Sequence, residues 1–175
     1  MKTVYYWCPY ISKVATVRSV LNSAESLKKY SKGEFQPVLL NVAGEWKEFE
    51  IEENKFNIKI INLTNSQILS NSNWTGFFKS RIIYIYIFII SFFPLLFFLK
   101  KNKPNFLIVH LISSLPLLVN CIFKLKTKIV LRISGLPKLN FLRNLFWKLA
   151  LKKVSFITSP TIGTVSDLVN KFNSK

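Results

Sequence analysis

The sequence predicts an α/β protein of the doubly wound class, in which helices cover both faces of a parallel sheet. Short β-branched and apolar runs alternate with helical patterns along the whole chain of 175 residues. Several of these runs are continuously apolar, as is typical of strands buried on both faces of a parallel sheet. Half of the residues are hydrophobic, which suits one Rossmann-like domain over 1–175 with a sizeable core and argues against disorder.

The first half of the chain contains three predicted strands and one predicted helix. The strands are expected at residues 3–8, 37–42 and 58–63. Residues 16–30 carry apolar side chains at helical spacing with charged residues between them, which predicts an amphipathic helix that stops before Gly33. The acid-rich residues 44–54 are expected to form a solvated loop or an edge hairpin. Residues 64–80 are polar and are expected to be mostly loop.

The second half continues the alternation of strands and helices. Strands are expected at residues 105–110, 128–133 and 154–159, and helices at 111–123, 141–151 and 161–172. Pro116 falls near the first turn of its helix, where a missing N–H costs little. The strand–helix alternation therefore extends from end to end.

The apolar run at residues 82–99 is long enough to be a candidate membrane span. Two features argue against a span: Pro94 is expected to kink or break the helix, and basic residues flank both ends without asymmetry. The run also lies between two predicted strands, where a parallel sheet requires a crossover helix. A crossover helix that also contacts membrane is favoured, and a purely buried helix or a true span remain alternatives.

The distribution of charge also suggests a membrane surface. Residues 1–53 carry seven basic and seven acidic residues, which cancel, so the net charge of +17 arises from residues 54–175, where Asp167 is the only acid. Because the same region is the most apolar, it is typical of a protein that binds anionic lipid. A low-acid composition without a functional cause is the alternative. Candidate membrane-contacting residues are Lys100, Lys101, Arg143, Trp147, Lys148 and Lys152.

Doubly wound sheets bind ligands outside the carboxyl ends of their strands, which here are followed by the loops at 9–15, 110–114, 132–137 and 159–162. In the first of these loops, Ser12, Lys13 and Thr16 are candidates to bind a phosphate or an acceptor near a helix N-terminus. An ordinary loop with Thr16 as the helix N-cap is the alternative.

Two other strand ends supply further candidates. His110 is the only histidine and can act as a base or hold a ligand hydroxyl, although it can also simply support a loop. Arg132 is a fixed positive charge suited to phosphate or carboxylate, and Gly135 would allow close backbone approach. A turn with a surface arginine is the alternative for this segment.

Several chemistries lack a sequence signal. The sequence contains no P-loop, no metal-ligand cluster, no nucleophile elbow and no recognisable nucleic-acid-binding motif, so neither a metal nor a nucleic-acid partner is expected. Cys8 and Cys121 lie in apolar surroundings and are expected to be free thiols in a reducing compartment. The N-terminus lacks the pattern of a signal peptide.

Several blocks of sequence resemble a known family. The segments YYWCPYISKVATVRSVLNSAESLKK, KPNFLIVHLISSLPLL and KIVLRISGLPKLNFLRNLFWK, the last followed by VSFITSPT, look like the N-terminal domain of family 4 glycosyltransferases, of the bacterial type that builds lipopolysaccharide or capsular polysaccharide. The resemblance covers nearly the whole chain and depends on the order and spacing of the blocks.

This resemblance implies one half of a GT-B enzyme that transfers a sugar from a nucleotide sugar to a lipid-linked or polysaccharide acceptor, without a resident cofactor. The N-terminal domain would bind the acceptor at the cytoplasmic face of the inner membrane, as a peripheral protein. Nothing in the chain corresponds to the C-terminal donor-binding domain, so we expect the chain to be inactive by itself. Many relatives carry a catalytically important histidine at the position of Ile112, so His110 can be the structural member of that pair.

Two other functions remain open. The chain can be a non-catalytic, membrane-binding partner of a separate donor-domain protein. It can also be an integral membrane protein that spans the bilayer with residues 82–99.

Overall fold

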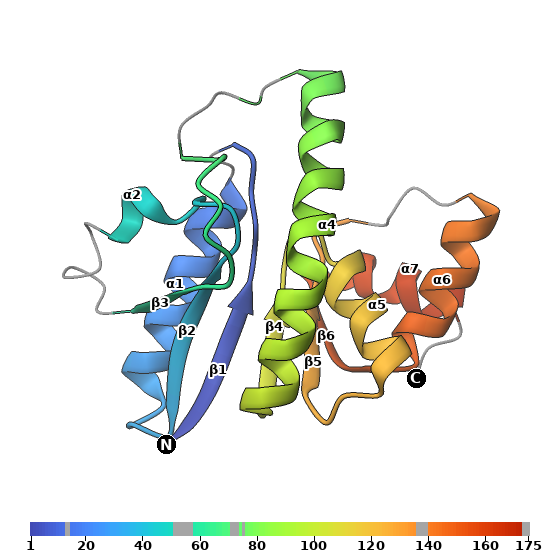
Figure 1. Cartoon of the computed structure of the whole chain (residues 1–175). Coiled ribbons are helices and arrows are strands. Elements are labelled where there is room, and N and C mark those ends of the chain that lie inside the picture. Colours follow the sequence, from blue (N-terminus) through green and yellow to red (C-terminus); the bar gives the residue numbers. More distant parts are fainter. Residues whose placement is uncertain (13–14, 51–57, 71–73, 75, 136–139, 173–175) are drawn as a thin grey trace.

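The computed structural model describes residues 1–12, 15–50, 58–70, 74, 76–135 and 140–172 (Figure 1). These residues form one six-stranded sheet in which every neighbouring pair of strands is parallel. The strand order is β3-β2-β1-β4-β5-β6. The strands are β1 (Lys2–Trp7), β2 (Phe35–Asn41), β3 (Lys59–Asn62), β4 (Phe106–Val109), β5 (Lys128–Arg132) and β6 (Val154–Thr158). The predicted doubly wound α/β class is confirmed.

Helices connect the strands and cover both faces of this sheet. They are α1 (Ala15–Tyr30), α2 (Lys47–Glu50), α4 (Phe77–Asn102), α5 (Ser114–Phe123), α6 (Phe141–Leu151) and α7 (Ile162–Phe172). Every strand and every long helix expected from the sequence is present, with bounds that differ by a few residues. The largest difference is at α4, which begins five residues before the apolar run and ends three residues after it.

Alternate residues of each central strand face two separate hydrophobic cores. On β1, Val4 and Tyr6 pack with Val20 and Ala24 of α1. Trp7, from the other face of the same strand, belongs to the core that is formed with α4, α5, α6 and α7. Because side chains alternate across a strand, a strand that is apolar throughout can contribute side chains to both cores.

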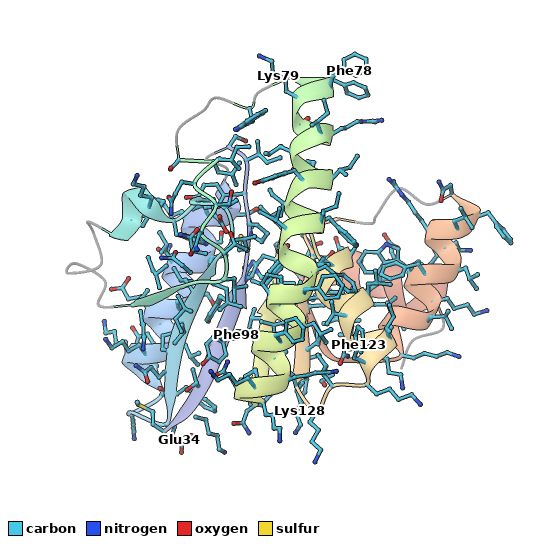
Figure 2. The ribbon with its side chains drawn as sticks, viewed as in Figure 1. Glu34, Phe78, Lys79, Phe98, Phe123 and Lys128 are labelled. Carbon is cyan, nitrogen blue, oxygen red and sulfur yellow. The ribbon has the colours of Figure 1, made fainter. Side chains whose placement is uncertain are left out.

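Helix α4 is the crossover between β3 and β4, and it stands upright across the sheet in Figure 1. One side of the helix is buried in the larger core through Ile83, Ile87, Leu95 and Leu99. Phe98 packs edge-on against Tyr5 of β1, with 4.9 Å between the ring centroids (Figure 2). The helix is also long and apolar enough to cross a membrane by length and composition, but its packing is that of a crossover helix.

Two local expectations need correction. Pro94 was expected to kink or break the apolar helix; the helix is not broken there, because α4 runs through Pro94 from Phe77 to Asn102. Proline removes one backbone hydrogen bond, and packing of the buried side on both sides of Pro94 compensates for that loss. The acid-rich segment was expected to be solvated, yet Glu45 and Trp46 are buried.

The buried position of Glu45 has a local cause. Its carboxylate accepts hydrogen bonds from the backbone N–H groups of Val42 (2.9 Å) and Ala43 (2.7 Å), which follow β2. The hydroxyl of Tyr10 donates to the backbone carbonyl of Glu45. Burial raises the pKa of Glu45 to about 7, although the backbone hydrogen bonds partly oppose this rise.

Candidate functional site

A crevice lies at the carboxyl ends of β4, β5 and β6, beside the start of α1. Its volume is about 230 Å³. The strand order reverses between β1 and β4, because β1 leads to β2 on one side and β4 continues the sheet on the other. Such a switch point is where open α/β sheets bind ligands. The residues that line the crevice are Thr16, Ser19, His110, Leu111, Ser113, Arg132, Ile133, Ser134, Gly135, Trp147 and Pro160.

His110 follows β4 directly and lies at the floor of this crevice. Its backbone N–H donates to the carbonyl of Trp7 (3.0 Å), and its ring stacks on Tyr6 with 6.2 Å between the ring centroids. The side chain is only 7% exposed, and its Nε2 atom has no hydrogen-bond partner among the described residues. An unpartnered buried nitrogen is unusual, and it makes His110 a candidate to hydrogen-bond a ligand.

Arg132 ends β5 on the neighbouring strand and supplies the positive charge of the crevice. Burial lowers the pKa of His110 to about 4, and the charge of Arg132 contributes to this lowering. His110 is therefore neutral at pH 7, so it can accept or donate one hydrogen bond at Nε2 according to its tautomer. None of the described lining residues is acidic.

The predicted site residues do not all meet in the crevice. Thr16, His110, Arg132 and Gly135 line it together, as their positions at strand and helix ends suggested. Ser12 is exposed and is not among the lining residues. Lys13 lies outside the described residues.

Two details of these predictions change. Thr16 lies within the first turn of α1, which begins at Ala15, and is therefore not its N-cap. A Cβ atom on Gly135 would meet nothing within 4 Å, so the protein itself does not require glycine there. Only a ligand could make use of the missing side chain.

Trp147 was expected to contact a membrane, and this expectation was wrong. Its side chain is 8% exposed and belongs to the larger core, because it shares one side of α6 with Ala150 and Leu151 at helical spacing. Trp147 is one of the residues that line the crevice. Sequence reasoning also missed Ser19 and Ser113, which lie three residues after Thr16 and His110 respectively.

The other proposed membrane contacts have the expected exposure. Lys100 and Lys101 at the end of α4 are exposed, as are Arg143, Lys148 and Lys152 on or just after α6. Twelve of the seventeen exposed large apolar side chains among the described residues also lie on α4 and α6. Both helices pack on the same side of the sheet, since their buried side chains share one core.

A wider groove lies between the N-terminal half of α4 and the loop that joins β4 to α5. It has a volume of about 770 Å³, and Arg143 of α6 also lines it. Tyr84, Ile85 and Ile89 form its apolar wall on α4.

No protein-family model matches the chain, and no curated protein matches it in sequence. Solved structures do match it in fold. A glycosyltransferase from Rickettsia africae superposes with a TM-score of 0.64 at 13% identity, over 99% of this chain and 40% of that one. A UDP-GlcNAc 2-epimerase from Neisseria meningitidis, bound to UDP-GlcNAc, gives a TM-score of 0.60 at 13% identity, over 98% of this chain and 43% of that one.

A third match is UGT73P12 of Glycyrrhiza uralensis in complex with glycyrrhetinic acid 3-O-monoglucuronide. Its TM-score is 0.60 at 8% identity, over 99% of this chain and 47% of that one. The fold is that of one GT-B domain. The chain thus spans less than half the length of these GT-B glycosyltransferases and epimerases.

The crevice of this GT-B domain combines few but specific groups. Arg132 can form a forked hydrogen bond to a phosphate or a carboxylate. Thr16, Ser19 and Ser113 offer hydroxyl groups, and neutral His110 offers one more polar atom. This set suits an anionic or polyhydroxylated ligand, and it lacks the acidic oxygens that Mg²⁺ or Ca²⁺ would require.

Proposed function

We propose that this chain is the acceptor-binding half of a GT-B glycosyltransferase, of the family 4 type that builds lipopolysaccharide or capsular polysaccharide. The complete enzyme would transfer a hexosyl group from a nucleotide sugar to a lipid-linked or polysaccharide acceptor. The observation that carries this proposal is the crevice at the switch point, which is lined by Arg132 and by His110, whose buried Nε2 has no hydrogen-bond partner among the described residues.

In this proposal each crevice residue has a defined role. Arg132 balances the negative charge of a phosphate, and the hydroxyl groups around it orient the acceptor. His110, which is neutral, holds an acceptor hydroxyl through Nε2, and an anionic phosphate beside it would raise its pKa toward the range of a general base. The donor domain that would complete the reaction is a second domain or a separate partner chain.

We place the proposed enzyme at the cytoplasmic face of the inner membrane, on anionic lipid. The support is the apolar outer side of α4 and α6 with its basic residues, since a surface that is both apolar and basic binds anionic bilayers. Phe93 and Phe97 belong to this surface and are 60% and 63% exposed. Replacing both with glutamate should abolish flotation with vesicles that contain phosphatidylglycerol.

A matched control exists for that experiment. Tyr30 ends α1, which packs on the opposite face of the sheet, and is 72% exposed. Tyr30→Glu should leave flotation unchanged. If Tyr30→Glu reduces flotation as much as the double variant does, general hydrophobicity and charge explain binding and the proposed surface is wrong.

Donor dependence tests the transferase itself. The purified chain would be titrated calorimetrically with a panel of nucleotide sugars, alone and with a GT-B donor-type domain supplied in trans. Binding that requires the second domain supports the proposal and names the sugar class. Tight binding by this chain alone would mean that the donor site lies in this half, which contradicts the proposal. No binding in either case would favour a membrane-binding partner without catalysis.

Arg132 can be tested in the same two-component system. Arg132→Ala should lower kcat/KM for transfer at least tenfold, because a charged hydrogen bond to phosphate contributes about 1.5–3 kcal/mol. Lys128→Ala, at the opposite end of the same strand, is the matched control and should have no effect. Equal turnover by wild type and Arg132→Ala would show that Arg132 is not part of the binding site.

Epimerisation of a nucleotide sugar is a second candidate function, because UDP-GlcNAc 2-epimerases share the fold as closely as the transferases do. The two functions differ in product. Proton NMR of UDP-GlcNAc incubated with the two-component system would separate them. An epimerase would form the 2-epimer without an acceptor, whereas a transferase would consume UDP-GlcNAc only when an acceptor is present. The apolar surface of α4 favours the transferase, since a freely diffusing nucleotide sugar needs no lipid-facing surface.

A further inference from the structure

The connection from β4 to α5 contains a serine at a helix start that does not act as a cap. Ser113 occupies the N-cap position of α5, but its backbone angles are helical (φ −64°, ψ −23°) and its side chain forms no capping hydrogen bond. A serine at this position normally has an extended backbone, and its hydroxyl accepts from the N–H of the second or third helical residue. The hydroxyl of Ser113 is therefore left for another partner.

The residues after Ser113 explain why it does not cap the helix. The third residue of α5 is Pro116, which has no N–H to donate. The N–H of the second residue, Leu115, donates to the carbonyl of Ile112 (3.4 Å) instead. Both partners of an ordinary cap are thus unavailable, and Ser113 lines the crevice together with Arg132.

Trp7 of β1 holds the same connection at two points. Its backbone carbonyl accepts from the N–H of His110 (3.0 Å), and its indole Nε1 donates to the carbonyl of Ile112 (3.3 Å). Trp7 is fully buried. Leu111 packs against the smaller core and Ile112 against the larger one, so the connection is fixed from both faces of the sheet.

Ile112 adopts a strained backbone conformation in this connection. Its φ is +47°, which is costly for a β-branched residue because the Cβ atom crowds the backbone. The other described non-glycine residues with positive φ lie just after helix ends, where a left-handed residue is common: Lys32, Lys103 and Lys124. Strain of this kind persists only where the surroundings impose it, and it is frequent at ligand sites.

We infer that Ser113 binds an oxygen of the anion that enters the crevice, and that Trp7 and Ile112 are positioning residues for its hydroxyl. Arg132 supplies the charge from β5, and Ser113 adds a directed hydrogen bond from the neighbouring connection. His110 lines the same crevice and is a second group there without a partner among the described residues. The inference rests on the proposed transferase function for the nature of the anion, which is a phosphate.

Phosphate binding can be followed at a single resonance. His110 is the only histidine in the chain, so the C–H signal of its ring in carbon-13-labelled protein reports on the crevice. Inorganic phosphate would be titrated into the purified chain at pH 7, with sodium chloride added to keep the ionic strength constant. We expect a saturable shift of this signal in the wild type and none in Arg132→Ala. Absence of a shift in the wild type would overturn the inference.

Two adjacent serines provide the decisive comparison. Ser113→Ala should weaken phosphate binding about tenfold or more, because a hydrogen bond to a charged group is lost. It should leave the midpoint of thermal unfolding unchanged, because no capping bond is lost. Ser114→Ala is the matched control, since Ser114 lines the groove and not the crevice, and it should leave phosphate binding unchanged. A lower midpoint with unchanged phosphate binding in Ser113→Ala would make Ser113 an ordinary cap and overturn the inference.

Two substitutions at Ile112 test the strained conformation. Glycine adopts a positive φ freely, whereas alanine does not. Ile112→Gly should therefore unfold at a higher temperature than Ile112→Ala, although glycine is elsewhere the less stabilising of the two. Ile112→Gly should nevertheless bind phosphate more weakly than the wild type, because the connection is no longer held in one conformation. Wild-type affinity in Ile112→Gly would show that Ile112 does not position Ser113.

The role of Trp7 needs a control for stability, because its side chain is fully buried. Trp7→Phe retains an aromatic ring and removes the N–H that binds the carbonyl of Ile112. It should weaken phosphate binding in the folded protein. Ile87→Ala, which removes packing from the same core without touching the crevice, should not. Equal phosphate affinity in Trp7→Phe and wild type would leave Trp7 with a packing role only.

The same assay identifies the source of the phosphate. Tighter binding of glucose 1-phosphate than of UDP assigns the anion to a sugar phosphate, and both probes should bind more weakly to Ser113→Ala. Tighter binding of UDP would contradict the proposed function, in which the donor site lies in the other half, but would leave the role of Ser113 in place. Sugar transfer by the two-component system that is unaffected by Ser113→Ala would support the transferase and overturn this inference.

Discussion

Two buried titratable groups should give the stability of this protein a compensated dependence on pH. Burial lowers the pKa of His110 to about 4 from 6.5 and raises the pKa of Glu45 to about 7 from 4.5. The folded state therefore disfavours the charged form of both groups. Because one group is a cation when charged and the other an anion, their effects on stability have opposite signs.

The two contributions can be worked out separately. A histidine with a lowered pKa contributes stability that is complete above pH 6.5 and is lost as the pH falls toward 4. A carboxyl group with a raised pKa contributes stability that is complete below pH 4.5 and is lost as the pH rises through 7. Each shift corresponds to about 3 kcal/mol, so between pH 4.5 and 6.5 the two slopes nearly cancel.

Single variants should reveal how each group by itself makes the free energy of unfolding depend on pH. In His110→Gln, the free energy of unfolding should fall by about 3 kcal/mol as the pH rises from 4.5 to 7, because Glu45 acts alone. In Glu45→Gln, it should fall by about 3 kcal/mol as the pH decreases from 6.5 to 4. Urea unfolding followed by tryptophan fluorescence at half-unit pH steps would measure both.

The double variant is the control for this experiment, because its profile should again be flat relative to wild type across the same range. The remaining carboxyl groups are common to all four proteins, so their effects cancel in the differences. If the profiles of His110→Gln and wild type run parallel between pH 4.5 and 6.5, the pKa of His110 is the same in the folded and unfolded states. The account of a neutral, buried histidine in the crevice would then be wrong.

Two other predictions concern packing. Gly44→Ala should lower the free energy of unfolding by about 2–4 kcal/mol, because Gly44 has φ +87° and a Cβ atom would lie 3.0 Å from the Cα of Gln67. Gly33 is the control: it has φ +84°, but a Cβ atom there would meet nothing within 4 Å, so Gly33→Ala should cost only about 1 kcal/mol. Similar losses for both would exclude the contact as the cause. Thermal unfolding should also show that Ile87→Ala costs about 2–5 kcal/mol, whereas Ile89→Ala, two residues away and 66% exposed, costs less than about 0.5 kcal/mol.

The order and type of the elements could be predicted from the sequence because they depend on local patterns. The run at 37–42, which is apolar except for Asn41, indicated a strand buried on both faces, and it became β2. The placement of His110 and Arg132 at one edge also followed without coordinates, since the carboxyl ends of parallel strands meet at the same edge of the sheet.

Features that depend on contacts distant in sequence could not be predicted in this way. Trp147 looked like one more aromatic residue on a basic helix, and only the docking of α6 decided that it is buried beside the crevice. Glu45 looked solvated because its neighbours are acidic, and its burial depends on the backbone of Val42 and Ala43.

The sequence by itself therefore determined a doubly wound sheet, its long apolar crossover helix, and a polar edge where its strands end. Tertiary structure alone decided which side of α4 is buried, because every side of that helix is apolar and periodicity could not select one. It also decided that the loop after β4 separates two cavities. In that loop Ile112 has a positive φ and lines the groove together with residues of α4, and neither feature is visible in a pattern of residues.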